Sequence, residues 1–180
     1  MEQKCEFVIY SSRYYCEIKN ANLIDENENV TTTTTNHLPN KTNADVQVVA
    51  YYDNSNNISF IPNSIFTTFP NIDYFSFRPG NNLKVLKPHF FKNAKKMTIL
   101  HIWGNKIRKL EAKLFVEAKN LQRIYLERNE ISSIDLSTFY GLNQLQYINL
   151  QINKIKFLHP KTFINLNSLS VLFLSGGENC

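Results

Sequence analysis

Residues 121–144 read LQRIYLERNEISSIDLSTFYGLNQ, and residues 145–168 read LQYINLQINKIKFLHPKTFINLNS. The second stretch follows the first without a gap and places its leucines, isoleucines, asparagine and phenylalanine at the same positions. Residues 97–120, MTILHIWGNKIRKLEAKLFVEAKN, carry apolar residues at these positions too. Self-similarity at a fixed period of about this length is the signature of a repeat architecture, so this repeat decides the fold.

The repeat extends in both directions. Residues 72–96 fit the pattern with one extra residue in the turn, as does the unit that ends FIPNSIFTTFPN, and LSVLFLSGGENC begins a sixth unit. We expect about five repeats in residues 46–174. Residues 1–45 are then an N-terminal cap, and residues 175–180 are the start of a truncated sixth repeat or of a C-terminal cap.

Each unit has the pattern L-x-x-L-x-L-x-x-N-x-I-x-x-I, followed by a phenylalanine five residues later. This pattern resembles the leucine-rich repeat. Together with CEFVIYSSRYYCEIKNANL, HLPNKTNADVQVV and LFLSGGENC, it is similar to the secreted leucine-rich repeat proteins of insects, notably Diptera. The resemblance implies an extracellular location and binding of proteins or microbial surface molecules.

The alternation at Ile124 and Leu126 has the period of a β-strand, with one face inward and one outward. A single unit cannot bury its apolar side alone, so neighbouring units stack and share a core. We therefore expect an α/β fold: a leucine-rich repeat solenoid, or horseshoe, with a parallel concave β-sheet. Its convex side should consist mostly of loops and short helices, with an N-terminal β-hairpin as the cap.

The asparagine in each unit has a structural explanation. The turn after each strand bends into the core, where an unsatisfied backbone group costs on the order of 1–3 kcal/mol. An asparagine amide supplies both donors and an acceptor there. We predict one ladder of Asn56, Asn81, Asn105, Asn129 and Asn153. Ligand binding by these residues is the alternative, but packing alone requires so regular a period.

Phenylalanines recur with the same period and predict a second ladder. They are Phe66, Phe91, Phe115, Phe139 and Phe163. Aromatic rings at this spacing should stack into a spine on the far side of the core from the sheet.

The N-terminal region contains two strand-like runs, FVIY and RYYC, bounded by Cys5 and Cys16. We predict a hairpin closed by a disulfide, with two buried free thiols as the alternative. The polar residues 27–43, NENVTTTTTNHLPNKTN, should form a surface loop. The odd cysteine, Cys180, marks either a truncated chain end or an intermolecular bridge.

Three segments match the acceptor pattern for N-glycosylation, at Asn29, Asn40 and Asn57. In a chain this rich in Asn and Thr, chance matches are expected. The sites are therefore consistent with secretion and do not establish it.

The outward side chains of the strands should line the concave face, the extended binding surface of solenoids. Aromatic residues and Arg are frequent there, and they supply much of the binding energy at interfaces. As ligand-binding candidates we select Tyr74, Arg78, His101, Trp103, Arg123, Tyr125, Glu127, Tyr147, Asn149 and Phe173. The same register also places Ser76, Ile99, Gln151, Val171 and Ser175 on this face.

Other classes of protein find little support. The formal charge is +5, and basic residues are interleaved with acidic ones, which favours a solvated surface over a nucleic-acid site. No apolar run is long enough to span a membrane, and the start MEQKCEF lacks the apolar core of a signal peptide. Phosphate-binding glycine loops, G-x-S-x-G and H-E-x-x-H are missing, so we expect no enzyme activity, cofactor or metal site.

The sequence thus favours a non-enzymatic, secreted module that binds a protein or glycan ligand, with innate-immune recognition as the role that the resemblance implies. One alternative is an ectodomain fragment of a cell-surface leucine-rich repeat receptor. Another is a dimerising structural module, forming a homodimer or heterodimer, because an uncapped end near Leu174 offers a pairing surface.

Overall fold

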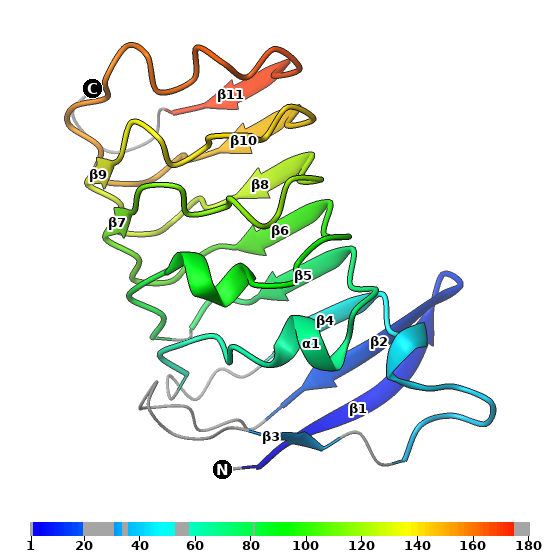
Figure 1. The fold of residues 1–180 in the computed structure, drawn as a ribbon. Helices are drawn as coiled ribbons and strands as arrows, with labels where there is room; N and C mark the ends of the chain where they lie inside the picture. The colour runs from blue at the N-terminus through cyan, green and yellow to red at the C-terminus, as the bar shows by residue number, and fades with distance from the viewer. Residues whose placement is uncertain (1, 20–30, 34–35, 53–57, 81, 175–180) are drawn as a thin grey trace.

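The computed structural model describes residues 2–19, 31–33, 36–52, 58–80 and 82–174. The chain winds into a solenoid whose strands stack one above another from the N-terminal to the C-terminal end (Figure 1). One nine-stranded sheet has the order β11-β10-β8-β6-β5-β4-β2-β1-β3. Its strands are β1 (Glu2–Tyr10), β2 (Arg13–Ile18), β3 (Thr31–Thr33), β4 (Val48–Tyr51), β5 (Tyr74–Phe77), β6 (Ile99–Ile102), β8 (Arg123–Tyr125), β10 (Tyr147–Asn149) and β11 (Val171–Phe173).

The register of this sheet follows the repeat in the sequence. From β4 to β11 every neighbouring pair is parallel. Ile99 lies opposite Arg123, which lies opposite Tyr147, which lies opposite Val171. Equivalent residues of successive repeats therefore stand in rows across the sheet. The predicted solenoid with a parallel concave sheet is confirmed.

The inward positions of the strands form the core. Phe75, Leu100, Ile124 and Ile148 are fully buried, and they belong to one apolar cluster that runs through the repeats. Because each coil packs on the one before and the one after, this cluster is continuous along the solenoid.

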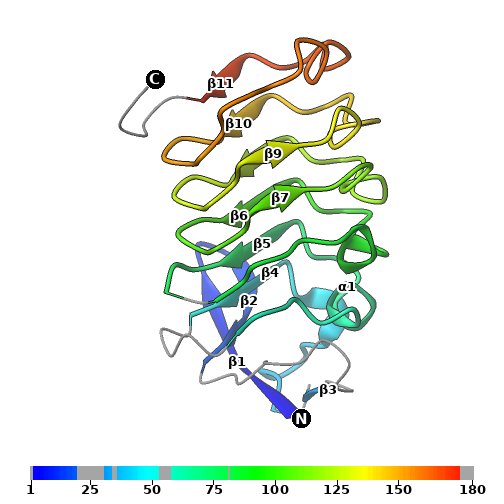
Figure 2. The same ribbon diagram turned by 90° about the vertical axis from the view of Figure 1, so that its left-hand side faces the viewer.

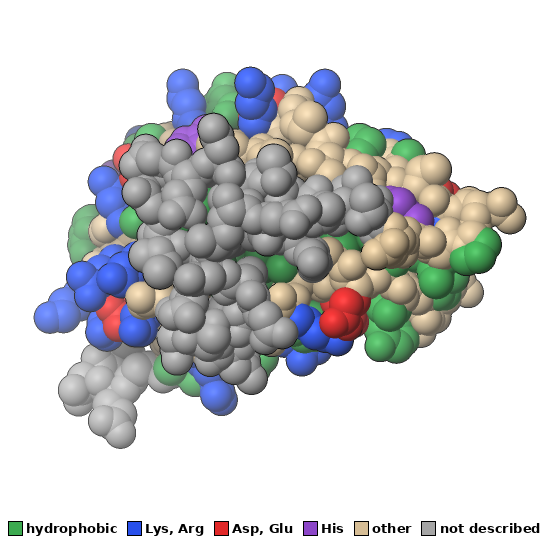
Figure 3. Space-filling view, turned by 90° about the horizontal axis from the view of Figure 1, so that it is seen from below, with side chains coloured by type: hydrophobic (Ala, Val, Ile, Leu, Met, Phe, Trp, Pro, Cys, Tyr) green, Lys and Arg blue, Asp and Glu red, His purple; other side chains and the backbone are tan. Residues whose placement is uncertain are grey.

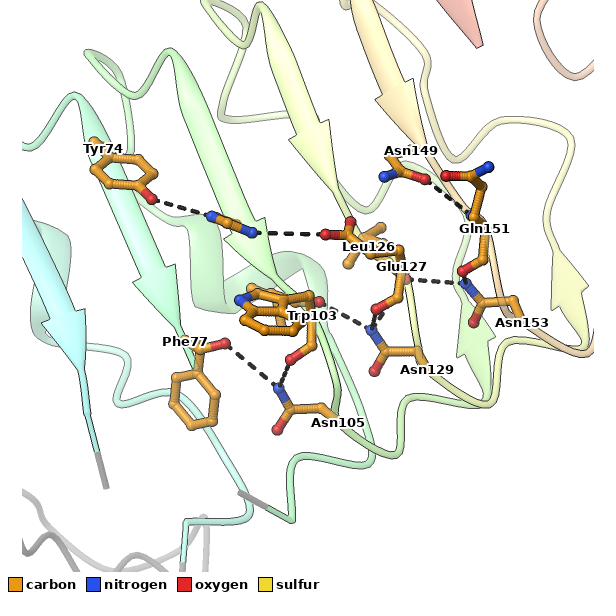
Figure 4. Close-up of polar contacts among 12 residues, drawn as sticks. Tyr74, Phe77, Trp103, Asn105, Leu126, Glu127, Asn129, Asn149, Gln151 and Asn153 are labelled. Atoms are coloured by element: carbon orange, nitrogen blue, oxygen red, sulfur yellow. Dashed lines mark hydrogen bonds and ion pairs between the residues drawn. The ribbon is translucent and has the colours of Figure 1, made fainter. Parts of the chain in front are cut away.

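The asparagine ladder lies in the turns that follow the strands (Figure 4). Asn129 Nδ2 donates to the carbonyls of Leu126 and Ile102, at 3.1 and 2.9 Å, and its Oδ1 accepts the N–H of Ile107 at 3.3 Å. Asn153 makes the equivalent bonds one repeat later. Asn105 donates to Trp103 O at 2.9 Å. Asn129 and Asn153 satisfy the buried turns as predicted, whereas Asn105 only donates, because its buried Oδ1 has no hydrogen-bond partner among the described residues. Asn56 and Asn81 lie outside the described residues.

The phenylalanine spine is present behind the sheet. Ring centroids of successive members lie 6.4, 5.2, 6.0 and 5.5 Å apart, from Phe66 through Phe91, Phe115 and Phe139 to Phe163. The first four rings are buried, and Phe163 in the last repeat is partly buried.

The convex side consists mostly of turns, with the short helix α1 (Ile65–Thr68) and the 3-10 turn η2 (Pro88–Phe91) in the early repeats. A second sheet, not predicted from the sequence, joins β7 (Lys109–Leu110) to β9 (Ser133–Ile134) in parallel, on the flank that faces the viewer in Figure 2. Its two strands are only two residues long, which is too short for a recognisable alternation.

The N-terminal hairpin continues the main sheet. β1 and β2 pair antiparallel around Ser11 and Ser12, both with positive φ, and β2 pairs in parallel with β4. The predicted disulfide joins Cys5 to Cys16. The hairpin thus covers the edge strand of the first repeat.

The prediction of a surface loop at residues 27–43 was wrong in part. Thr31–Thr33 forms β3, which pairs in parallel with the outer edge of β1. Threonine is β-branched and suits a strand, and an open strand edge offers backbone groups to pair with. The following residues close over the hairpin: His37 stacks on Phe7 at 4.0 Å, and Asn43 starts the 3-10 turn η1 (Asn43–Asp45).

Candidate functional site: the concave face of the sheet

The outward side chains form three rows across the concave face. The first row contains Tyr74, Ile99, Arg123, Tyr147 and Val171; the second contains Ser76, His101, Tyr125, Asn149 and Phe173; the third contains Arg78, Trp103, Glu127 and Gln151. Backbone pairing fixes the first two rows. In the third, Gly104 N donates to Glu127 O at 3.0 Å, which aligns Trp103 with Glu127.

The ten candidates all lie on this face, and none is sealed in the core. Arg78, Arg123 and Phe173 are exposed, and the other seven are partly exposed. Ser76 differs from the expectation, because it is only 5% exposed. Its side chain is small, and it stands between the much larger Tyr74, two residues before it on β5, and Arg78, which directly follows that strand.

Aromatic rings make a continuous track along this face. The centroid of His101 lies 4.9 Å from that of Tyr125, and Tyr125 lies 4.8 Å from Tyr147. Phe173 extends the track at 5.8 Å from Tyr147, and Trp103 flanks it at 6.0 Å from His101. The rings come from four successive strands. The register places His101, Tyr125 and Phe173 in the second row, and Tyr147 joins them from the first row, where it pairs with Arg123.

A polar chain crosses the same surface (Figure 4). The hydroxyl of Tyr74 and Nδ1 of His101 are hydrogen-bonded at 3.1 Å, and His101 Nε2 lies 3.7 Å from Oε1 of Glu127. Burial raises the pKa of the Tyr74 phenol, and it also raises the pKa of the Tyr147 phenol. Both phenols therefore stay neutral at physiological pH and act as hydrogen-bonding aromatic groups.

Positive charge on this face is placed at its margins. The guanidinium of Arg78 stacks over the ring of Tyr52 at 3.9 Å, and that of Arg13 lies over Tyr74 at 6.0 Å and pairs with Asp73. Seen from the N-terminal end, Lys and Arg side chains project from both sides and are mixed with acidic ones (Figure 3).

A groove lies beside the sheet and was not predicted from the sequence. It has a volume of about 710 Å³ and runs along the edge where the strands begin. Its lining is mostly polar and includes Gln47, Asn71, Asn120, Gln122 and Gln144. Several of these amides bond the coils to one another, as when Asn120 donates to Lys95 O at 2.7 Å. A polar residue directly precedes each strand along it, Gln47 before β4, Asp73 before β5, Thr98 before β6 and Gln122 before β8, and this recurrence is the signal that could have revealed the groove.

Of the remaining predicted sites, some lie within the described residues and others lie outside them. Asn40 is exposed in a turn before η1, and its glycosylation stays a prediction. Asn29, Asn57, Ser175 and Cys180 lie outside the described residues.

In the described part of the chain, no helix has the length and apolar composition that a membrane span requires. No group of three or more His, Cys, Asp or Glu side chains in the same part is placed to hold a metal ion.

Stacked coils, one parallel sheet and a polar amide in each turn define a solenoid repeat protein with an open sheet face. A family model described as leucine rich repeat matches residues 79–131 and 119–178, which together span more than half of the 180-residue chain. The chain belongs to the leucine-rich repeat family. No curated protein matches it in sequence.

Solved structures with the same fold include three leucine-rich repeat proteins. The APL1 leucine-rich repeat domain has a TM-score of 0.75 at 17% identity, over 97% of this chain and 43% of that one. Toll in the Toll–Spatzle complex of Drosophila has a TM-score of 0.65 at 16% identity, over 89% and 25%. TLR13 in complex with ssRNA13 has a TM-score of 0.64 at 20% identity, over 70% and 17%. The chain thus spans less than half the length of each, and at these identities the likeness shows the fold alone.

Proposed function

We propose that the chain is a non-enzymatic, extracellular binding module that recognises a protein or a microbial surface ligand through its concave face. The observation that carries this proposal is the track of rings from His101 to Phe173, partly exposed and flanked by Trp103. Aromatic side chains supply large contact area at little conformational cost, and Trp and Tyr are frequent hot-spot residues.

An extracellular role is supported by the Cys5–Cys16 disulfide, because such bonds persist in oxidising compartments. The exposed sequon at Asn40 is consistent with it. Innate-immune recognition is favoured because one similar structure, the Toll–Spatzle complex, is described as a molecular hub in Drosophila development and innate immunity. A receptor ectodomain is the second candidate, since the chain matches 25% of the Toll chain in that complex.

The test is binding by variants of the concave face. The full chain is immobilised, used to capture partners from extracellular fluid, and the captured species are identified by mass spectrometry. Trp103→Ala and Tyr125→Ala should each weaken the binding of a captured partner at least tenfold, because each truncates a central ring. Tyr140→Ala removes an exposed ring from the convex side and serves as the matched control. Unchanged affinity in both concave variants would exclude this face as the binding surface.

A further inference from the structure

Glu127 is an acidic group in the middle of an aromatic surface. Its side chain is 18% exposed and stands beside Trp103 in the third row of the concave face. Oε1 lies 3.7 Å from His101 Nε2, and Oε2 has no hydrogen-bond partner among the described residues. A carboxylate removed from water without full pairing is costly, so the free protein holds an incompletely satisfied anion at this place.

Within the described part of the chain, Glu127 forms an ion pair with His101 and none with a Lys or Arg side chain. Arg78, in the same row, stacks on Tyr52 at 3.9 Å, and Arg123 stands at the other end of β8 in the first row. His101, whose Nε2 faces Glu127, already shares its Nδ1 with Tyr74. On the other side, Gln151 follows strand β10 of the next coil and carries a neutral amide (Figure 4).

Two aromatic residues neighbour Glu127 on the concave face. Trp103 stands beside it in the third row, with Gly104 N bonded to Glu127 O, and Tyr125, the last residue of β8, precedes it by two residues. The faces of Trp and Tyr rings attract cations, and Arg more often than Lys. The terminal torsion of a glutamate is broad, so the unpaired oxygen can turn toward the open face when a donor arrives.

Resting on the proposed function, we propose that Glu127, Trp103 and Tyr125 form a pocket for an arginine side chain of a protein partner. A guanidinium matches this arrangement because it is planar, presents several donors to a carboxylate and stacks on aromatic rings. It would supply donors to both oxygens of Glu127 and neutralise the charge. A neutral oligosaccharide could stack on the same rings, but it would leave that charge unpaired.

The probe is the peptide acetyl-Gly-Arg-Gly-amide, and the reporter is the fluorescence of Trp103, the sole tryptophan of the chain. We expect a saturable fluorescence change with this peptide and at least tenfold weaker binding of the citrulline analogue, which has nearly the same shape without the charge. Glu127→Gln should weaken arginine-peptide binding at least tenfold. Glu117→Gln, an identical change at an exposed residue in the convex turn that precedes β8, should leave it unchanged.

Several results would overturn the proposal. They are equal binding of the citrulline peptide, no saturable change up to millimolar arginine peptide, or unaltered binding by Glu127→Gln. Saturable binding of maltohexaose that is equal in wild type and Glu127→Gln, without binding of the arginine peptide, would assign the rings to a glycan. If a captured partner is lost in Trp103→Ala but retained in Glu127→Gln, the arginine pocket fails while the concave-face function stands.

Discussion

Single polar side chains hold the coils of this solenoid in register. The side-chain amide of Asn129 bonds two backbone groups of the preceding repeat, Ile102 O and Ile107 N, in addition to backbone groups of its own repeat. It is itself only 6% exposed. Water therefore cannot replace these bonds when the amide is removed, and each orphaned group is costly.

Asn129→Leu should lower the free energy of unfolding by about 3 kcal/mol or more, since two or more buried backbone groups lose their partners at roughly 1–3 kcal/mol each. Asn143→Leu, at an exposed position in the following turn, is the matched control and should change stability by less than about 0.5 kcal/mol. Urea denaturation followed by circular dichroism measures both. Equal stability of the two variants would contradict a structural ladder.

A second residue, Asp135, makes the free energy of unfolding depend on pH. Asp135 accepts hydrogen bonds from the backbone N–H and the hydroxyl of Ser137, both at 2.8 Å, and the backbone bond is the main reason that its pKa lies below the usual range. A carboxyl whose pKa is lower in the folded state stabilises the protein above its unfolded-state pKa. That contribution disappears as the pH falls through the folded-state pKa.

Asp135→Ala should therefore be less stable than the wild type at pH 7, and this difference should shrink as the pH is lowered into the range where the folded-state carboxyl is protonated. Thermal unfolding at neutral pH and at several acidic values measures it, with Glu117→Ala as the exposed-carboxyl control. A difference from the wild type that is the same at every pH would show that the carboxylate contributes no linked stability.

At the scale of secondary-structure elements, the β1–β2 hairpin is the part held covalently. Cys5 and Cys16 are 11 residues apart in sequence, and the hairpin they close pairs with β4 through β2. Cross-linking a loop of this length removes conformational entropy from the unfolded state, which stabilises the folded state by about 3 kcal/mol. Cys5→Ala/Cys16→Ala should accordingly lower unfolding stability by about 2–4 kcal/mol, measured by urea denaturation against the oxidised wild type. A decrease in the free energy of unfolding below about 1 kcal/mol would show that the hairpin folds without its disulfide.

The elements also show what the sequence could and could not predict. The rows containing Trp103 and Tyr125 followed from the period, because a strict repeat fixes which side of each strand faces outward. The pairing of Thr31–Thr33 with β1 did not, since it joins segments outside the repeat and leaves no periodic pattern. The unpaired oxygen of Glu127 could not be predicted from the sequence either, because it depends on side-chain positions in neighbouring coils.

At the scale of the whole molecule, stability should be graded along the solenoid. Each coil contacts only its neighbours, so a coil in the middle is held from two sides and one at an end from a single side. In the described part of the sheet, β6 lies between β5 and β8, whereas β11 pairs only with β10. Leu172, on β11, is also only partly buried, unlike its counterpart Ile148 on β10.

Native-state hydrogen exchange should therefore show amides of β11 exchanging at least about tenfold faster than those of β6 and β8, because local opening at an end breaks fewer contacts. The measurement is exchange followed by mass spectrometry at two protein concentrations. Protection of β11 equal to that of β6 would contradict this gradation of stability along the sheet. If that protection rose with concentration, a second copy would be covering the exposed Phe173 and Leu174, and the dimerising alternative would replace the monomeric binder.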